Sequence, residues 1–567
     1  MNIKKSEILS FKDYFYLSNI EILIILFSLS AVTQLIYFYL LPLSYTIDSY
    51  QYILNNSEIR PPAYAWFLKL LGINIFKNSI LVISFQMILI AAIPVLVFQT
   101  VVKSGKISAI IAAVLSMFYG YMYTMSVQVM SESLFIFGCV LTVYLISLYH
   151  SKQKTYLLVI TCLCLILTSE IRQSSVPLFG GIFLMILLML IKLRKIKFLI
   201  HSFLVLGVFL SYSSIRTLFI DKNGFDLMPF FMVHWMPDIN TSNWEISGDK
   251  VEFSPRIIDK NNGEKGQELA EYMKKLFTER DDIYVVMSSL RTNAGGVYKQ
   301  RPEFKIYNDE NINKLVDDIL YNRKYNAHRW PHLVNLLWEA YGVEKTSDLL
   351  HGAIIEGLIK NPTFFKNFYI PQLQRTIKSG QALHDNVYWW FIPSRETSVS
   401  ILDQFPLGGS AYASWLYSLE DKTGKDPLAK KGEGGVLAYT PLLNKKINLD
   451  TLSKLSNKNP FESYKELNNY TAPAIYIGSL LTRALAILYL LSLPFIVVFS
   501  LFCKQKEIVI PIIGSITLII AISFLAQPYP RQIFIHMPLL FAVFGMGLAG
   551  FNESVSKFTK SINNKLK

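Results

Sequence analysis

The sequence has few charged residues and almost no cysteine. Only 17% of its 567 residues are Asp, Glu, Lys or Arg, whereas 52% are hydrophobic. The four cysteines all lie in apolar runs, so the polar parts of the chain have neither a disulfide framework nor a cysteine-ligated zinc site. The chain also lacks the Gly-x-x-x-x-Gly-Lys-Ser/Thr loop of ATP-driven pumps. This composition favours a membrane protein over a soluble one.

Ten apolar runs approach the roughly 20 residues that a helix needs to cross a bilayer core. The first run is long and lacks an Ala-x-Ala cleavage site, which predicts a retained span and not a signal peptide. The sequence therefore predicts an all-α polytopic membrane protein with about ten transmembrane helices. The runs lie near residues 19–41, 79–102, 107–125, 130–149, 155–169, 174–192, 198–219, 479–502, 507–526 and 532–550.

Basic charge is distributed unevenly along the chain. Residues 221–470 hold 31 Lys and Arg against 32 Asp and Glu, which is typical of a soluble domain. The remaining residues hold 24 basic and 9 acidic side chains, so the excess positive charge follows membrane topology and does not indicate nucleic-acid binding. If the N-terminus is cytoplasmic, 17 of those 24 basic residues fall on the cytoplasmic side. This orientation predicts that both termini are cytoplasmic in a multi-pass protein of the cell (inner) membrane.

This topology divides the chain into three parts. The second part is expected to be mostly helical, because apolar residues recur every three to four residues from Leu349 to Leu358, and Asn361-Pro362 ends that helix. The parts are a seven-span module with an outer loop at 42–78, an extracytoplasmic domain inserted between spans seven and eight, and a three-span module with a cytoplasmic tail, over residues 1–219, 220–478 and 479–567.

Arginines in the membrane part break the positive-inside trend. Five of the six fall on the predicted outer side, where a guanidinium fork suits a phosphate or carboxylate, so they indicate a bound anion. The alternative is that individual arginines reach lipid headgroups. Acidic residues on that side are also functional candidates, and the alternative for Glu132 and Glu170 is pairing with nearby arginines to hold helix ends together. These residues are Arg60, Arg172, Arg216, Arg483 and Arg531, with Asp48, Glu58, Glu132 and Glu170.

Five motifs in this order resemble the GT-C membrane glycosyltransferases, in the branch that includes protein O-mannosyltransferases and lipid A aminoarabinose transferase. The resemblance covers about residues 1–220 and 475–550. In the last motif Gln532 stands where the family usually has tyrosine. The motifs are I-D-S-Y at 47–50, R-P-P-A-Y at 60–64, S-E-S-L-F at 131–135, T-S-E-I-R at 168–172 and P-R-Q-I-F-I-H-M-P at 530–538.

The resemblance implies a GT-C fold and an enzyme that moves a sugar from a polyprenyl-phosphate donor to a glycan, lipid or protein acceptor at the outer membrane face. It implies Asp48 as the catalytic base, with inversion at the anomeric carbon in a single displacement. No cofactor and no metal site are indicated, and a divalent metal requirement stays open. The donor-phosphate ligands would be Arg60, Arg172, Arg483 and Arg531, supported by Glu58, Glu132, Glu170 and Tyr64.

Two alternatives remain from the residues alone. One is a transporter or flippase of lipid-linked saccharides, in which the arginines guide phosphate through a cavity. The other is an oligosaccharide ligase or polymerase. A G-x-G-x-x-G run at 545–550 spells the dinucleotide fingerprint, but it ends an apolar run with no strand before it, so it predicts close helix packing.

Overall fold

The computed structural model describes most of the apolar part of the chain and pieces of the polar part. Residues 45–51 and 53–60 of the predicted outer loop are outside the described set. The described residues are 18–40, 43–44, 52, 61–71, 79–127, 129–219, 238–239, 253–254, 261–279, 343–363, 370, 436–440, 445–448, 481, 484–485, 488, 491–492, 494–499, 502–503, 505–526 and 535–565.

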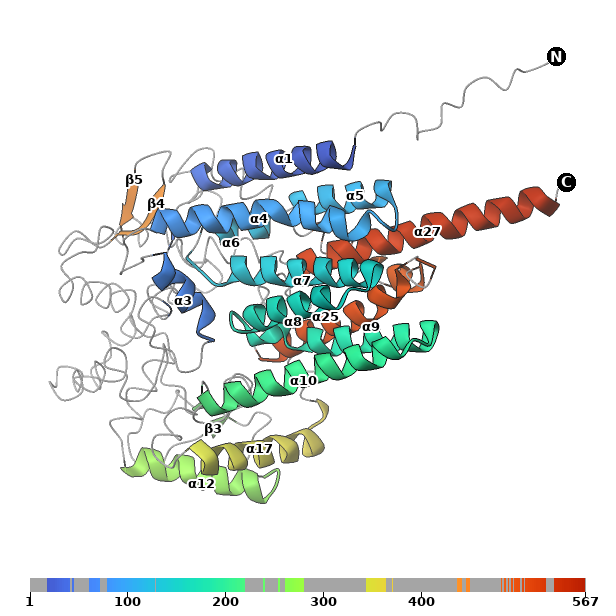
Figure 1. Ribbon diagram of the computed structural model, residues 1–567. Helices are drawn as coiled ribbons and strands as arrows, with labels where there is room; N and C mark the ends of the chain where they lie inside the picture. The colour runs from blue at the N-terminus through green and yellow to red at the C-terminus, as the bar shows by residue number, and fades with distance from the viewer. Residues whose placement is uncertain are drawn as a thin grey trace, which may run out of the picture.

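The apolar part forms a helical bundle (Figure 1). Within the described residues, six helices are long and apolar enough to cross a membrane, or seven if the bent pair α5–α6 is one span. The multi-pass helical character predicted from the sequence is thus confirmed, whereas ten spans remain a prediction. The helices are α1 (Asn19–Leu40), α3 (Ala63–Leu70), α4 (Ser79–Val101), α5 (Lys106–Met117), α6 (Gly120–Ser126), α7 (Glu132–Lys152), α8 (Thr155–Ser169), α9 (Pro177–Leu193), α10 (Ile196–Phe219), α25 (Lys506–Ala526) and α27 (Met537–Lys565), with a 3-10 turn η1 (Gln173–Ser175).

Successive helices run in opposite directions, so their connections gather at two ends of the bundle (Figure 1). We name the lysine end after Lys103, Lys152, Lys154, Lys192 and Lys195, which lie where α4, α7 and α9 end and α5, α8 and α10 begin. We name the arginine end after Arg172 and Arg216, which lie in the α8–α9 connection and near the end of α10. The helix directions therefore separate the two groups of basic residues, as the alternating spans predicted.

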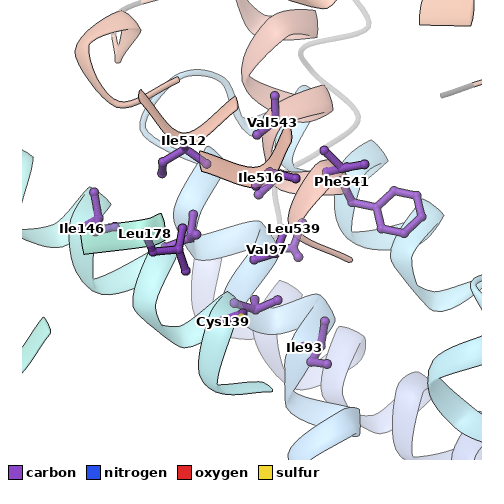
Figure 2. Close-up of a cluster of buried hydrophobic side chains, with 14 of the residues drawn as sticks. Ile93, Val97, Cys139, Ile146, Leu178, Ile512, Ile516, Leu539, Phe541 and Val543 are labelled. Carbon is purple, nitrogen blue, oxygen red and sulfur yellow. The ribbon is translucent and has the colours of Figure 1, made fainter. Parts of the chain in front are cut away.

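A continuous apolar core joins helices from both ends of the sequence. α9 packs against α25, and α27 packs against α4, α5 and α7, so the C-terminal helices complete the bundle made by the N-terminal ones. Close van der Waals packing of these aliphatic side chains stabilises the arrangement. Figure 2 shows part of the core, with Ile93 and Val97 of α4, Cys139 and Ile146 of α7, Leu178 of α9, Ile512 and Ile516 of α25, and Leu539, Phe541 and Val543 of α27.

The glycine run at 545–550 packs helices closely, as predicted. A Cβ atom at Gly545 would lie 2.8 Å from the Ala112 Cβ of α5. A Cβ atom at Gly550 would lie 2.0 Å from the carbonyl oxygen of Phe499, which no real contact allows. The glycines of this motif thus let α27 approach its neighbours, and they lie inside that helix.

Two of the predicted spans differ most from the structure. The run 107–125 is broken between Met117 and Gly120, where α5 and α6 meet at a bend of 52°. The run 532–550 becomes a helix that begins at Met537 and continues to Lys565, with residues 555–564 exposed. Apolar length located the second helix but not its end, because the helix continues through polar residues that hydropathy does not register.

The described pieces of the polar part contain a helix pair and short strands. α12 (Glu264–Glu279) packs on α17 (Val343–Lys360), which ends before Asn361-Pro362 as predicted. Glu356 of α17 accepts the backbone N–H groups of Lys265 and Gly266, at 2.9 and 2.8 Å, and so satisfies the first turn of α12. The strands are β1 (Leu43–Ser44), β4 (Val436–Thr440) and β5 (Lys445–Asn448) in one antiparallel sheet, and β2 (Asp238–Ile239) paired with β3 (Phe253–Ser254).

Candidate functional site

The arginine end brings together every predicted site residue that the structure describes. Tyr64 lies on α3, Glu132 begins α7, Glu170 ends α8, and Arg172 follows in the turn before η1. The other predicted site residues lie outside the described residues, and their roles stay predictions. They are Asp48, Glu58, Arg60, Arg483 and Arg531.

Glu132 and Arg172 form an ion pair across α7 and the α8–α9 connection. Arg172 NH1 donates to Glu132 Oε1 at 3.0 Å. The Glu132 carboxylate is buried, whereas 21% of the Arg172 side chain is exposed. Within the described part of the chain this is the one side-chain hydrogen bond that Arg172 donates, although a guanidinium carries five N–H groups. Among the described residues, the other N–H groups of Arg172 have no side-chain acceptor.

Glu170 and Arg216 form a second ion pair, between α8 and α10, that is buried on both sides. Arg216 NH1 donates to Glu170 Oε1 at 2.5 Å, and the Tyr212 hydroxyl donates to the same oxygen at 2.7 Å. With its amide oxygen turned toward Arg216, Gln173 accepts from Nε at 2.6 Å and from NH1 at 3.2 Å. Arg216 is thus surrounded by protein acceptors, and this pair closes α10 onto α8.

The two carboxylates sit at opposite ends of helix dipoles. Glu132 is the first residue of α7, where the positive end of the dipole and the Ser131 hydroxyl, 3.5 Å from Glu132 Oε2, favour a negative charge. Glu170 is the C-cap of α8, where the dipole disfavours a negative charge. Glu170 consequently depends on Arg216 and Tyr212 for compensation, whereas Glu132 does not depend on Arg172 alone.

The segment carrying the R-P-P-A-Y motif is fastened to these helix ends. The backbone N–H of Ala63 donates to the backbone carbonyl of Glu170 at 3.0 Å. The Tyr52 hydroxyl donates to Ser131 Oγ at 3.0 Å, next to Glu132, and the Tyr52 ring meets the Tyr64 ring edge-on at 4.8 Å. These contacts join three of the five motif regions, which are separated by up to about 110 residues in sequence.

Tyr64 is fully buried and links α3 to the interior of the bundle. Its hydroxyl donates to Gln86 Oε1 of α4 at 2.8 Å, and Gln86 Nε2 donates to the carbonyl of Ser126, the last residue of α6, at 3.1 Å. These two hydrogen bonds through Gln86 hold the start of α3 against α4 and α6. Its position beside the acid–arginine pairs supports Tyr64 as a structural residue of the site.

An aromatic stack supports Arg172 from the bundle side. The Arg172 guanidinium lies 5.7 Å from the centroid of the Phe135 ring, and the ring of His536 meets Phe135 edge-on at 5.5 Å. His536 is buried at the start of α27 and belongs to the 530–538 motif. The fourth and fifth motif regions thus lie at the same end, on either side of Phe135.

The sequence predicted where the acids and arginines of this site lie better than which of them form ion pairs. Pairing with nearby arginines was one of the two interpretations for Glu132 and Glu170, and both acids form such pairs in the structure. Glu170, however, pairs with Arg216 and not with the adjacent Arg172. Tyr212, Gln86 and Gln173 carried no signal, except that Tyr212 lies four residues before Arg216 on one helix face.

The described residues provide anion-binding donors and acids without a metal cluster. No three His, Cys, Asp or Glu side chains among them are arranged to hold a metal ion. What the arrangement offers is a partly exposed guanidinium, two carboxylates and a loop held beside them. Comparisons of the chain with protein families, with curated proteins and with solved structures found no match.

Proposed function

We propose that the protein is a glycosyltransferase of GT-C type. It would move a sugar from a polyprenyl-phosphate donor to an acceptor at the outer face of the membrane, and arginines of the arginine end would bind the donor phosphate. One observation carries the proposal. The hydrogen bond from Ala63 to Glu170, with that from Tyr52 to Ser131, joins the loop that would supply Asp48 and Arg60 to the turns that carry Glu132 and Arg172.

The chemistry requires little apparatus. Asp48 would take the proton of the acceptor hydroxyl as its oxygen attacks the anomeric carbon, and the bond from that carbon to the phosphate oxygen would break. Arginine donors would stabilise the charge growing on the leaving phosphate. Arg172 has donors to spare and is partly exposed, so it fits this role better than Arg216, which the protein already surrounds.

Transfer assays test the proposal. Purified protein, incubated with radiolabelled polyprenyl-phosphate sugars and membrane extract, should form a labelled product from one of the donors. Asp48→Asn should lower turnover by roughly 10² to 10⁴ because a general base is lost while size is kept. Donor binding should survive in this variant. Near wild-type transfer by Asp48→Asn would move the base to another acid, with Glu58 or Glu132 next.

A second function has one observation in its favour. The bend of 52° between α5 and α6 interrupts a span, as broken helices do in many transporters of the kind that would flip lipid-linked saccharides. A flippase would carry the lipid-linked sugar across liposomes without cleaving it. Recovery of intact donor on the far side, with no transferred product, would favour this function over the enzyme.

A further inference from the structure

The two ion pairs of the arginine end differ in how many guanidinium N–H groups have acceptors in the protein. Glu132 engages one N–H group of Arg172, at 3.0 Å, and the remaining donors of that side chain have no acceptor within the described part of the chain. The carboxylate itself is only 3% exposed. A ligand phosphate bound by the free donors of Arg172 would consequently lie close to a fixed negative charge.

That negative charge persists when a ligand competes for Arg172. Glu132 is the first residue of α7, so the helix dipole stabilises its carboxylate independently of the arginine. The Ser131 hydroxyl lies 3.5 Å from Glu132 Oε2 and adds a hydrogen bond. Arg172 also rests on the Phe135 ring at 5.7 Å, which holds the guanidinium in place while its partners change.

We infer that Glu132 is a positioning residue that holds the Arg172 guanidinium for the donor and makes the site select a phosphate with one negative charge over a phosphate with two. The inference rests on the proposed function. The Glu132 carboxylate repels a nearby phosphate in proportion to the charge of that phosphate, so it disfavours a doubly charged phosphate more than a singly charged one. The carboxylate is only 3% exposed, so this repulsion is poorly screened.

A phosphate linked to both a polyprenol and a sugar is a diester and carries one charge. A polyprenyl phosphate that has already lost its sugar is a monoester, and its second ionisation, at a pKa of about 6, gives it nearly two charges above neutral pH. Selection by charge would therefore favour the loaded donor over the spent lipid product. Glu132 would in this way limit product inhibition of the same site.

Competition between two lipids tests the inference. The probes are the methyl phosphodiester of a polyprenol and the phosphate monoester of the same polyprenol, so that the tails are identical and only the charge differs. Both are mixed with the full-length protein in detergent micelles at pH 8, and native mass spectrometry gives the ratio of the two bound species. The wild type should prefer the diester, and Glu132→Gln should shift this ratio by about tenfold toward the monoester, the order expected for one charge at a partly buried site.

Matched variants separate charge from folding. Glu132→Asp keeps the charge at the same helix end and should keep the wild-type preference. Glu507→Gln removes a buried carboxylate at the lysine end, where it pairs with Lys192, and should also leave the preference unchanged. A structural role for Glu132 alone would weaken binding of both lipids without changing their ratio.

The outcomes distinguish this inference from the proposed function. An unchanged ratio in a folded Glu132→Gln variant overturns the role of Glu132 and leaves the glycosyltransferase proposal standing. If that variant does not fold, equal binding of the two lipids by the wild type overturns the inference by itself. Absence of binding of either lipid by the wild type overturns the proposed function, and the inference with it.

Discussion

The two ends of the bundle use buried polar side chains differently. At the lysine end these groups pair with one another: Gln505 accepts from Ser104 at 2.9 Å and donates to Ser147 at 3.0 Å, while Glu507 forms ion pairs with Lys192 and His150. At the arginine end, Arg216 is similarly enclosed but Arg172 is not. Saturated groups hold helices together, and an arginine with spare donors is where a ligand gains most.

The largest expected effect comes from breaking the enclosed pair. Arg216→Ala should lower the free energy of unfolding by about 3 to 5 kcal/mol, because it leaves the Glu170 carboxylate buried at the unfavourable end of the α8 dipole. Unfolding on heating is measured by the reaction of the buried cysteines Cys139, Cys162 and Cys503 with a thiol-reactive fluorophore. A melting temperature equal to the wild type would show that Glu170 does not depend on Arg216.

The next effect tests close packing near the lysine end. Gly550→Ala should lower the free energy of unfolding by about 1 to 3 kcal/mol, because a Cβ atom there would overlap the Phe499 carbonyl oxygen at 2.0 Å. Gly514→Ala on α25 is the matched control, since a Cβ atom at Gly514 meets nothing within 4 Å. The same thermal assay should separate them, and similar melting temperatures for the two variants would mean that α27 is not held at the distance described.

Breaking the open pair should affect stability less than breaking the enclosed one. Arg172→Ala should lower the free energy of unfolding by about 1 kcal/mol. The α7 dipole still compensates Glu132 in this variant, and a fifth of the Arg172 side chain already faces solvent. Binding of the polyprenyl phosphodiester should be lost in the same variant. A stability loss as large as that of Arg216→Ala would remove the distinction between the two pairs.

The smallest effect concerns the turn between α9 and α10. Arg194 has a positive φ of 51° at the C-cap of α9, a conformation that glycine adopts without cost. Arg194→Gly should therefore raise the free energy of unfolding by about 0.5 to 1 kcal/mol, because the relief of strain in the folded state outweighs the added freedom of the unfolded chain. The thermal assay checks the sign, with Arg194→Ala as the control that keeps the strain.

Apolar length and charge sidedness predicted most of the bundle. α8 occupies residues 155–169 as expected, and α1, α4, α10 and α25 each differ from their predicted runs by one or two residues at one end. Hydropathy records how apolar a segment is, so it did not reveal the bend between Met117 and Gly120, which contains no proline.

The site was predictable by region but not by partner. Order and sidedness of the motifs placed Glu132, Glu170 and Arg172 at one end, and the helix directions agree. The choice between Arg172 and Arg216 for Glu170 depends on where each side chain leaves its helix, which sequence spacing does not determine across separate helices. The roles of Asp48 and Arg60 remain predictions that the transfer assays address.

The contact between Ala63 and Glu170 has a consequence for how the protein could diversify. Both atoms belong to the backbone, so substitutions of either side chain leave the hydrogen bond in place, and at position 63 only proline would remove the donor. This point of attachment therefore does not depend on which side chains stand at positions 63 and 170. Substitutions at position 63 other than proline can accumulate without releasing the loop from the end of α8.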